Sequence, residues 1–288
     1  MAAHPRPTVR RRKLGSELRR LREAAKVGMN DAGAAIDGDK TKISRIENGR
    51  QGIRPLEIKE LCKLYSVADE RVVSALLTLA RESRKKSWWQ QYSGVLSPDF
   101  QQRLTLEADA VRIYAFHTMV IPGLLQTREY AEAVIRGSGR HTPDLEIETS
   151  VNFRMERQAI FDRPDAPQYL CVLDEAVLHR EVGSPQIMSN QLRHLVEAAT
   201  RPGVGVQIVP YSQGTYAGFE GPFTIYSYPD PMELDVVGLE YLEGALYLEE
   251  ASPVEAYRRS FDRIRASALS SRQSMELVSR IAQDHDTK

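Results

Sequence analysis

Three polar side chains in the stretch 39–50 are of the types that read DNA bases. Lys40, Thr41 and Arg45 are spaced so that, on a helix, they project away from the apolar residues of the same stretch. A short helix that presents Lys, Thr and Arg and has a firmly packed back suits the reading of base edges in a DNA major groove. The sequence therefore predicts base contacts by these three residues.

The neighbouring residues predict the helix that has to position them. Asp39 is a favoured N-cap residue, because its carboxylate can accept hydrogen bonds from the free N–H groups of the first turn. Ile43 and Ile46 are three residues apart and fall on one face, where they can anchor the helix to a core. Asn48 and Gly49 form a good C-terminal stop, since both tolerate the left-handed conformation.

Helical patterns continue on both sides of this stretch. Leucines and an alanine repeat at spacings of four, three and four over residues 14–25, and Asp37-Gly38 forms a turn before the helix at 39–50. The expected helices cover residues 14–25, 30–36, 39–47, 55–65 and 69–83. We therefore expect an all-α bundle over residues 14–84 that contains a helix-turn-helix.

The first 13 residues have the composition of a basic arm. They contain two prolines and end in four consecutive basic residues, so we expect residues 1–13 to be disordered. Arg10, Arg11 and Arg12 are expected to contact DNA phosphates or to enter a minor groove. A solubilising tail without specific contacts is the alternative.

The run Lys42-Ile43-Ser44-Arg45-Ile46-Glu47-Asn48-Gly49-Arg50 resembles the Xre, or lambda-repressor-like, DNA-binding domain, and the resemblance covers about residues 14–80. The resemblance implies that Lys40, Thr41 and Arg45 contact bases, as their spacing also predicts. It further implies that Lys42, Asn48 and Arg50 contact DNA phosphates. Met29 stands where the family often has Gln, and Asp37 stands where it usually has the turn glycine. An amphipathic helix in a bundle that does not touch DNA is the alternative interpretation.

The chain has 288 residues and no net charge, but its charge is unevenly divided. Residues 1–86 contain 21 Lys+Arg and 11 Asp+Glu, whereas residues 87–288 contain 18 and 28. A basic head joined to an acidic body is typical of a polyanion-binding head with a separate body. The length also favours about two domains, at roughly 150 residues each.

The composition argues against several classes of protein. No run of about 18 apolar residues exists, so we expect no membrane partner. The basic N-terminus lacks the apolar segment of a signal peptide. Cys62 and Cys171 make no metal-binding pattern with the six histidines. We therefore expect a cytoplasmic protein that has no metal and no cofactor.

The second part of the chain follows a segment, 85–98, that we expect to be an aromatic linker. Both tryptophans, Trp88 and Trp89, lie in it, and large aromatic side chains are usually buried, which favours docking or core packing over a ligand surface. Helical and strand-like patterns alternate after it, which predicts an α/β or α+β domain over residues 99–285. The expected helices cover 100–116, 127–136, 147–161, 185–199, 253–268 and 272–283. The expected strands cover 169–173, 204–210, 223–228 and 236–242.

Four motifs stand out in this second part. They are residues 120–127 (VIPGLLQT), 155–158 (MERQ), 172–178 (VLDEAVL) and 261–270 (FDRIRASALS). Together they resemble the uncharacterised C-terminal domain of WhiJ-like regulators of actinomycetes, over about residues 87–283. The resemblance implies a transcriptional regulator that is often paired with a small partner protein in an antitoxin-like arrangement, and it implies no ligand-binding residues.

Carboxylates near the ends of expected strands raise the question of catalysis. Asp174, Glu175 and Asp235 are of the type that binds Mg²⁺ for phosphodiester chemistry. No lysine or histidine lies at a sequence spacing from these carboxylates that is typical of a catalytic site. The sequence therefore predicts no catalytic residues and no enzyme activity.

The glycine-rich loop 211–222 lies between two expected strands. Tyr211, Tyr216 and Phe219 are candidates to line a pocket or groove for an effector or partner, because recognition residues often lie on loops. The alternative is a long ordered hairpin loop with its aromatic rings packed beneath it.

These features together predict a sequence-specific transcription factor that binds double-stranded DNA as a homodimer. Its C-terminal domain would dimerise, sense a signal or bind a small protein. The alternative function is an antitoxin-like module that binds a small partner protein and uses DNA binding for autoregulation. A third function, an enzyme fused to a DNA-targeting head, would need a metal-dependent activity.

Overall fold

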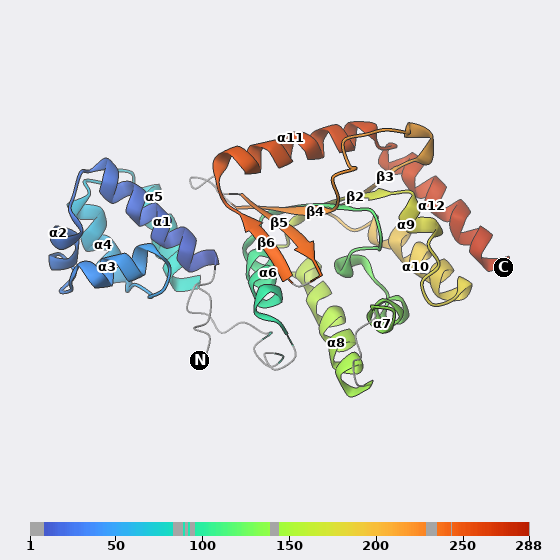
Figure 1. Cartoon of the computed structure of the whole chain (residues 1–288), viewed down its shortest axis with the longest axis horizontal. Coiled ribbons are helices and arrows are strands. Elements are labelled where there is room, and N and C mark those ends of the chain that lie inside the picture. The colour runs from blue at the N-terminus through green and yellow to red at the C-terminus, as the bar shows by residue number, and fades with distance from the viewer. Residues whose placement is uncertain are drawn as a thin grey trace. The chain divides into compact units, whose positions relative to one another are not determined.

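The structure, a computed structural model, describes residues 9–82, 89, 92, 96–138, 144–228, 235–242 and 244–287 (Figure 1). The chain forms two compact units. The first comprises Met1–Gln91, Leu96–Asp109 and Tyr228–Leu234, and the second comprises Tyr92–Val95, Ala110–Ser227 and Asp235–Lys288. The first unit is helical and the second combines a mixed sheet with helices, which confirms the predicted fold class.

The first unit is a bundle of short helices around one apolar core. Its helices are α1 (Val9–Ala24), α2 (Met29–Ala34), α3 (Lys40–Glu47), α4 (Pro55–Leu64), α5 (Glu70–Glu82) and α6 (Pro98–Asp109). The buried side chains at its centre include Leu14, Leu18, Ile43, Ile46, Ile58, Leu61 and Leu76. α6 packs on α1, so it belongs to this unit, although the sequence analysis expected it to open the second domain. Trp89 is buried, and Trp88 lies outside the described residues.

The N-terminal helix starts earlier than expected. α1 begins at Val9, so Arg10, Arg11 and Arg12 lie in its first turns. Arg11 and Arg12 are half-buried, and the side chain of Arg10 lies outside the described residues. The expectation of a disordered arm is therefore wrong for residues 9–13, which form the first turns of α1. Residues 1–8 lie outside the described residues.

Two glycines allow α1 and α3 to approach closely. A Cβ atom on Gly15 would lie 2.4 Å from the carbonyl oxygen of Ile46. Gly49 has φ +70°, and a Cβ atom there would lie 2.8 Å from the backbone nitrogen of Arg12. A side chain at either position would push the two helices apart, so both positions favour glycine.

The second unit is built on a six-stranded mixed sheet. Its strands are β1 (Arg112–His117), β2 (Gln168–Asp174), β3 (Val204–Val209), β4 (Phe223–Ser227), β5 (Val236–Tyr241) and β6 (Gly244–Leu248), in the order β3-β2-β1-β4-β5-β6. β1, β2 and β3 are parallel, and β4, β5 and β6 continue the sheet antiparallel. Ala115 of β1 is paired with Cys171 on one side and with Thr224 on the other.

The central strand β1 contradicts the expected helix over 100–116. That helix ends as α6 at Asp109, and the chain then enters the sheet. Ala115 and Phe116 lie on opposite faces of β1, and both are almost completely buried. A central strand that is apolar on both faces has no polar alternation, so its residues also fit a helical pattern.

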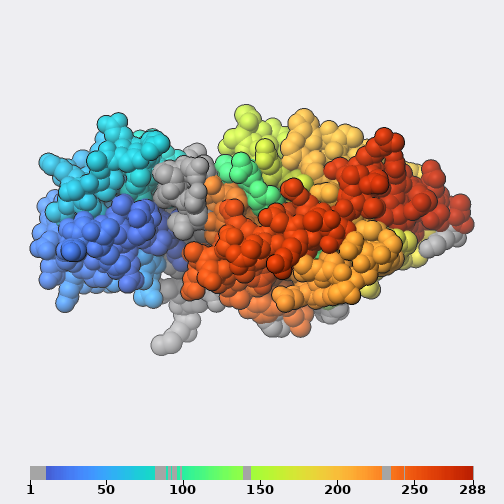
Figure 2. Space-filling model, turned by 90° about the horizontal axis from the view of Figure 1, so that it is seen from above, coloured from blue at the N-terminus to red at the C-terminus, as the bar shows by residue number. Residues whose placement is uncertain are grey.

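Helices cover both faces of this sheet. The helical segments of the unit are η2 (Gly123–Leu125), α7 (Arg128–Arg136), α8 (Asp144–Arg157), η3 (Gln158–Asp162), α9 (Ala176–His179), α10 (Pro185–Ala198), η4 (Tyr211–Gln213), α11 (Ala251–Ser267) and α12 (Ser271–Asp286). α11 packs Phe261 and Ile264 onto one face, against Phe116, Val172 and Ile225. α7, α8 and α10 lie on the opposite side, and the view in Figure 2 looks onto the exposed outer side of α11.

The outer edge of β3 is covered by the chain that enters α12. The backbone N–H of Leu269 donates to the carbonyl oxygen of Ile208 at 2.8 Å. The hydroxyl of Ser274 accepts from the N–H of Ile208 at 3.0 Å, and the side chain of Gln207 donates to the carbonyl oxygen of Leu269 at 2.8 Å. These bonds satisfy strand groups that would otherwise face solvent.

Candidate nucleic-acid interface

Helix α3 has the start and the packed back that the sequence predicts. The carboxylate of Asp39 accepts from the backbone N–H of Lys42 at 2.8 Å, and this hydrogen bond lowers the pKa of Asp39. Ile43 and Ile46 are buried in the core of the first unit. The helix is therefore fixed at its first turn and along its inner face, which leaves its outer face to carry other contacts.

The three residues predicted to read bases all lie on this outer face. Lys40, Thr41 and Arg45 are exposed, while the residues between them that point inward are buried. Arg45 follows Thr41 by one helical turn, so the two side chains are neighbours. The structure thus brings the three together on one surface, and their contact with DNA stays a prediction.

The turn before α3 explains how Asp37 replaces the usual glycine. Asp37 has φ +51°, a left-handed conformation that Asp adopts at lower cost than most residues. Gly33, in α2, lies so close to the start of α3 that an added Cβ atom would be 2.7 Å from the carbonyl carbon of Asp39. The small residues of α2 therefore permit a close helix pair instead of weakening it.

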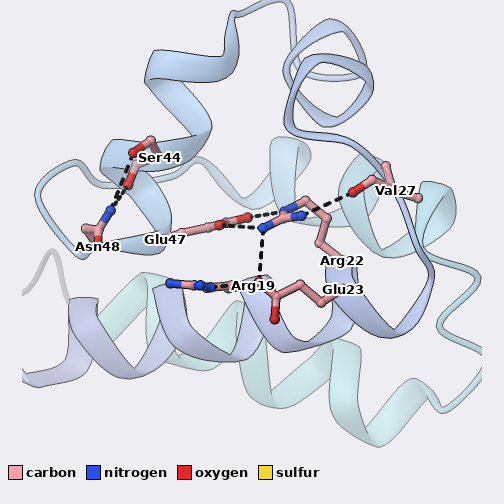
Figure 3. A network of polar contacts seen from close by, with 7 residues as sticks. All are labelled: Arg19, Arg22, Glu23, Val27, Ser44, Glu47 and Asn48. Atoms are coloured by element: carbon pink, nitrogen blue, oxygen red, sulfur yellow. Dashed lines mark hydrogen bonds and ion pairs between the residues drawn. The ribbon is translucent and has the colours of Figure 1, made fainter.

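The residues predicted to contact phosphates have different surroundings. Arg50 is exposed just after α3. Asn48 is also exposed, but its side-chain amide donates to the carbonyl oxygen of Ser44 at 2.7 Å and so closes the end of the helix (Figure 3). An Asn48 contact with a phosphate through this amide would have to replace that bond.

The side chain of Lys42 is partly buried and tied to neighbouring elements of the first unit. Its ammonium group lies 2.9 Å from a carboxylate oxygen of Glu57 and donates to the carbonyl oxygen of Ile36 at 3.1 Å. The first bond ties α3 to α4, and the second ties α3 to the end of α2. We therefore assign Lys42 a structural role, in place of the phosphate contact that the resemblance implies.

Glu57 lies at the centre of this group of charges. Burial acts to raise the pKa of its carboxyl, but hydrogen bonds from the backbone N–H and guanidinium of Arg54 and from Lys42 outweigh burial and lower the pKa to about 2. A carboxylate with a pKa below its unfolded value contributes stability at neutral pH and loses that contribution as the pH falls.

This pKa predicts how the first unit responds to acid. Between pH 6 and pH 3 the natural protein should lose about 2 kcal/mol more stability than Glu57→Gln, because Glu57 takes up a proton only when the unit unfolds. Urea unfolding followed by tryptophan fluorescence measures the difference, since both tryptophans lie at residues 88 and 89. Parallel pH dependences in the two proteins would contradict the role of Glu57.

A second, buried ion pair joins α1 to the end of α3 (Figure 3). The guanidinium of Arg22 donates to both carboxylate oxygens of Glu47, at 2.6 and 3.0 Å, and to the carbonyl oxygen of Val27 at 3.1 Å. The side chains of Arg22 and Glu47 are 9% and 4% exposed. The sequence does not reveal this pair, because Arg22 lies beside an apolar stripe and its partner is 25 positions away.

The aromatic residues of the loop 211–222 make two sets of contacts, and their role in binding an effector or partner stays a prediction. Tyr216 is half-buried, donates to a carboxylate oxygen of Asp174 at 2.5 Å and lies 5.3 Å from Phe219, ring centroid to ring centroid. Tyr211 instead stacks on His179 at 5.5 Å. The alternative of a hairpin loop is wrong, because β3 and β4 are not neighbours in the sheet and the loop crosses from one to the other.

The carboxylates considered for catalysis have structural partners. Asp174 accepts from Tyr216 and from the backbone N–H of Ala176. Asp235 accepts from the hydroxyl of Ser227 at 2.9 Å and from Arg258 at 2.6 Å. Within the described part of the chain, no three His, Cys, Asp or Glu side chains group as they would around a metal ion. Among the same residues, every helix is too short or too polar to cross a lipid bilayer.

Two families match the chain. Residues 13–76, which include α2 and α3, match the family described as a helix-turn-helix domain. Residues 100–280 match the family described as a domain of unknown function, DUF5753. No curated protein and no solved structure matches the chain. The chain therefore belongs to the DUF5753 family and carries a helix-turn-helix domain in front of the part that defines that family.

Proposed function

We propose that the protein is a sequence-specific DNA-binding transcriptional regulator of the Xre type. The observation that carries this proposal is the outer face of α3, where Lys40, Thr41 and Arg45 are exposed on a helix whose other side is anchored in the core. A helix with this geometry can enter a major groove and place these donors against base edges. The match of residues 13–76 to a helix-turn-helix domain supports the same conclusion.

Phosphate contacts would supply the part of the affinity that depends on salt. Arg50, next to the end of α3, and the arginines in the first turns of α1 are the cations that we assign to this role. Gly49 approaches the backbone of Arg12, so these basic residues come from neighbouring parts of the unit. Lys42 is left out of this set because Glu57 already pairs with it.

We assign dimerisation and regulation to the second unit. One helix-turn-helix reads few base pairs, and dimers on half-sites about one helical turn apart are the usual solution. We propose a cytoplasmic homodimer whose second unit senses a signal or binds a small partner protein, and the resemblance to WhiJ-like regulators supports the small partner protein. The antitoxin-like alternative differs only in making the partner protein the main target. We propose that the protein is not an enzyme, because Asp174 and Asp235 are already engaged by structural partners.

Arg45→Ala tests the proposed function. The DNA bound by the natural protein is first recovered from genomic fragments, and the affinity for the enriched sequence is then compared with that for a scrambled one. Arg45→Ala should weaken binding to the enriched sequence by about 1–3 kcal/mol and relax the sequence preference, since it removes donors to a base edge. Equal losses on both DNAs would falsify base reading by Arg45.

The control variant is Arg71→Ala. Arg71 is exposed on α5, which packs on α1 and α4, and its guanidinium pairs with Asp69 at 2.9 Å. Removing it changes the net charge by the same amount as Arg45→Ala. Binding to the enriched sequence should therefore change little in this control, and no enrichment of any DNA by the natural protein would contradict the proposed function itself.

A further inference from the structure

A cavity of about 430 Å³ opens in the second unit, on the side of the sheet that carries α8 and α10. This volume lies within the range of about 300–1,000 Å³ that is typical of small-molecule sites. The walls come from η2, the end of α8, η3, α10 and the first residue of β3. None of the residues 211–222 lines it, so it is a different place from the loop that the sequence analysis singled out.

Seven of the twelve residues that line the cavity are apolar. They are Leu124, Leu125, Met155, Ala159, Phe161, Ala198 and Val204. Several of them also belong to the buried core, so the wall is part of the folded unit and does not depend on a ligand for its shape. A ligand would therefore contact more apolar surface than polar surface.

The segment that carries two of these leucines is fixed by glutamine side chains. Gln158 donates to the carbonyl oxygens of Gly123 and Gln126, at 3.1 and 2.7 Å. Gln191, which is fully buried, accepts from the N–H of Thr127 and donates to the carbonyl oxygen of Leu125, both at 2.7 Å. Because these bonds satisfy the backbone around η2, this wall of the cavity is preformed, as binding sites usually are.

The charged residues at the cavity disfavour an anion. The guanidinium of Arg201 pairs with a carboxylate oxygen of Asp162 at 2.7 Å and lies 6.0 Å from the centre of the Phe161 ring. Glu197 adds a second carboxylate to the lining. Burial lowers the pKa of His194, so at neutral pH its imidazole is uncharged and offers one donor and one acceptor.

We propose that this cavity binds a small, largely apolar molecule that has no negative charge and that hydrogen-bonds to His194. The apolar wall sets the class of ligand, and the two carboxylates set its charge. The site lies entirely in the second unit, so the proposal does not depend on DNA binding by the first.

N-Phenyl-1-naphthylamine is a suitable probe, because it is uncharged and fluoresces in apolar surroundings. The full-length protein should bind it saturably at one site. 8-Anilinonaphthalene-1-sulfonate has the same ring skeleton with an added sulfonate, and it should bind at least tenfold more weakly. Absence of saturable binding of the uncharged probe would overturn the proposal, and equal affinities would overturn the assigned charge of the ligand.

Filling the cavity locates the probe. Ala159 lines the cavity yet is exposed, so Ala159→Trp adds a ring to the site without disturbing the core. It should weaken binding of the uncharged probe at least tenfold, whereas Ala266→Trp, on the exposed side of α11, should leave binding unchanged. Thermal melting identifies a variant that fails to fold, and Met155→Trp then takes its place. Unchanged binding in a folded cavity-filling variant would show that the probe lies elsewhere and that the proposal is wrong.

Discussion

Arg22→Met should lower the free energy of unfolding of the first unit by about 3–5 kcal/mol, because it leaves the carboxylate of Glu47 buried without its cationic partner. The carboxylate is 4% exposed and receives two hydrogen bonds from Arg22. Urea unfolding followed by tryptophan fluorescence measures the loss in the full-length protein.

Two further variants separate this effect from a general loss of charge on α1. Arg19 pairs with Glu23 on the same helix, but both side chains are more than half exposed, so Arg19→Met should cost much less stability than Arg22→Met. The double variant Arg22→Met/Glu47→Leu removes the orphaned charge and should recover most of the stability. Equal losses for Arg22→Met and Arg19→Met would contradict the role of the buried pair.

Gly15→Ala should destabilise the first unit by about 3 kcal/mol, which is opposite in sign to the usual effect of this change. In an ordinary helix, replacing glycine by alanine is favourable by about 0.5–1 kcal/mol. At Gly15 the new methyl group would lie 2.4 and 2.5 Å from the carbonyl oxygens of Ile46 and Glu47, which are backbone atoms that a rotamer change cannot move. Overpacking of this kind forces the two helices apart.

Gly52→Ala is the matched control for this variant. The change is the same, and a Cβ atom at Gly52 would meet no heavy atom within 4 Å. The same unfolding measurement should show little change for Gly52→Ala. A stable Gly15→Ala protein would mean that α1 and α3 do not approach as closely as described.

The features of α3 could be predicted because they are local. The N-cap at Asp39 and the apolar pair Ile43 and Ile46 depend on residues within one or two turns, and all three appear in the structure as the sequence indicates. The partners of Arg22 and Lys42 depend on folding, since Glu47 and Glu57 lie 25 and 15 positions away. A charge pattern cannot show which basic residues find a buried carboxylate, so the sequence alone reveals neither the Arg22–Glu47 pair nor the Lys42–Glu57 pair.

In the second unit too, features that depend on neighbouring residues could be predicted, and features that depend on distant segments could not. Strands β2 to β5 were predicted within a residue or two, because short β-branched and aromatic runs between turns identify them. The sequence predicts a helix where β1 lies, and it predicts no strand at β6. The cavity is formed by segments from Leu124 to Val204, and no local spacing reveals that these segments meet. The loop 211–222 was predicted as a candidate effector site because its glycine-rich, aromatic composition is unusual.

The covering of β3 by the start of α12 has a consequence for aggregation. An uncovered edge strand presents N–H and C=O groups to which a strand of another molecule can add. Here Leu269 and Ser274 occupy the C=O and N–H groups of Ile208, and the side chain of Gln207 holds Leu269 in place. The last 20 residues thus act as a protective cap as well as a packing element. A polypeptide chain that ends before Leu269 would expose this edge of β3 during and after synthesis. Fibrous self-association through β3 would then become its main hazard.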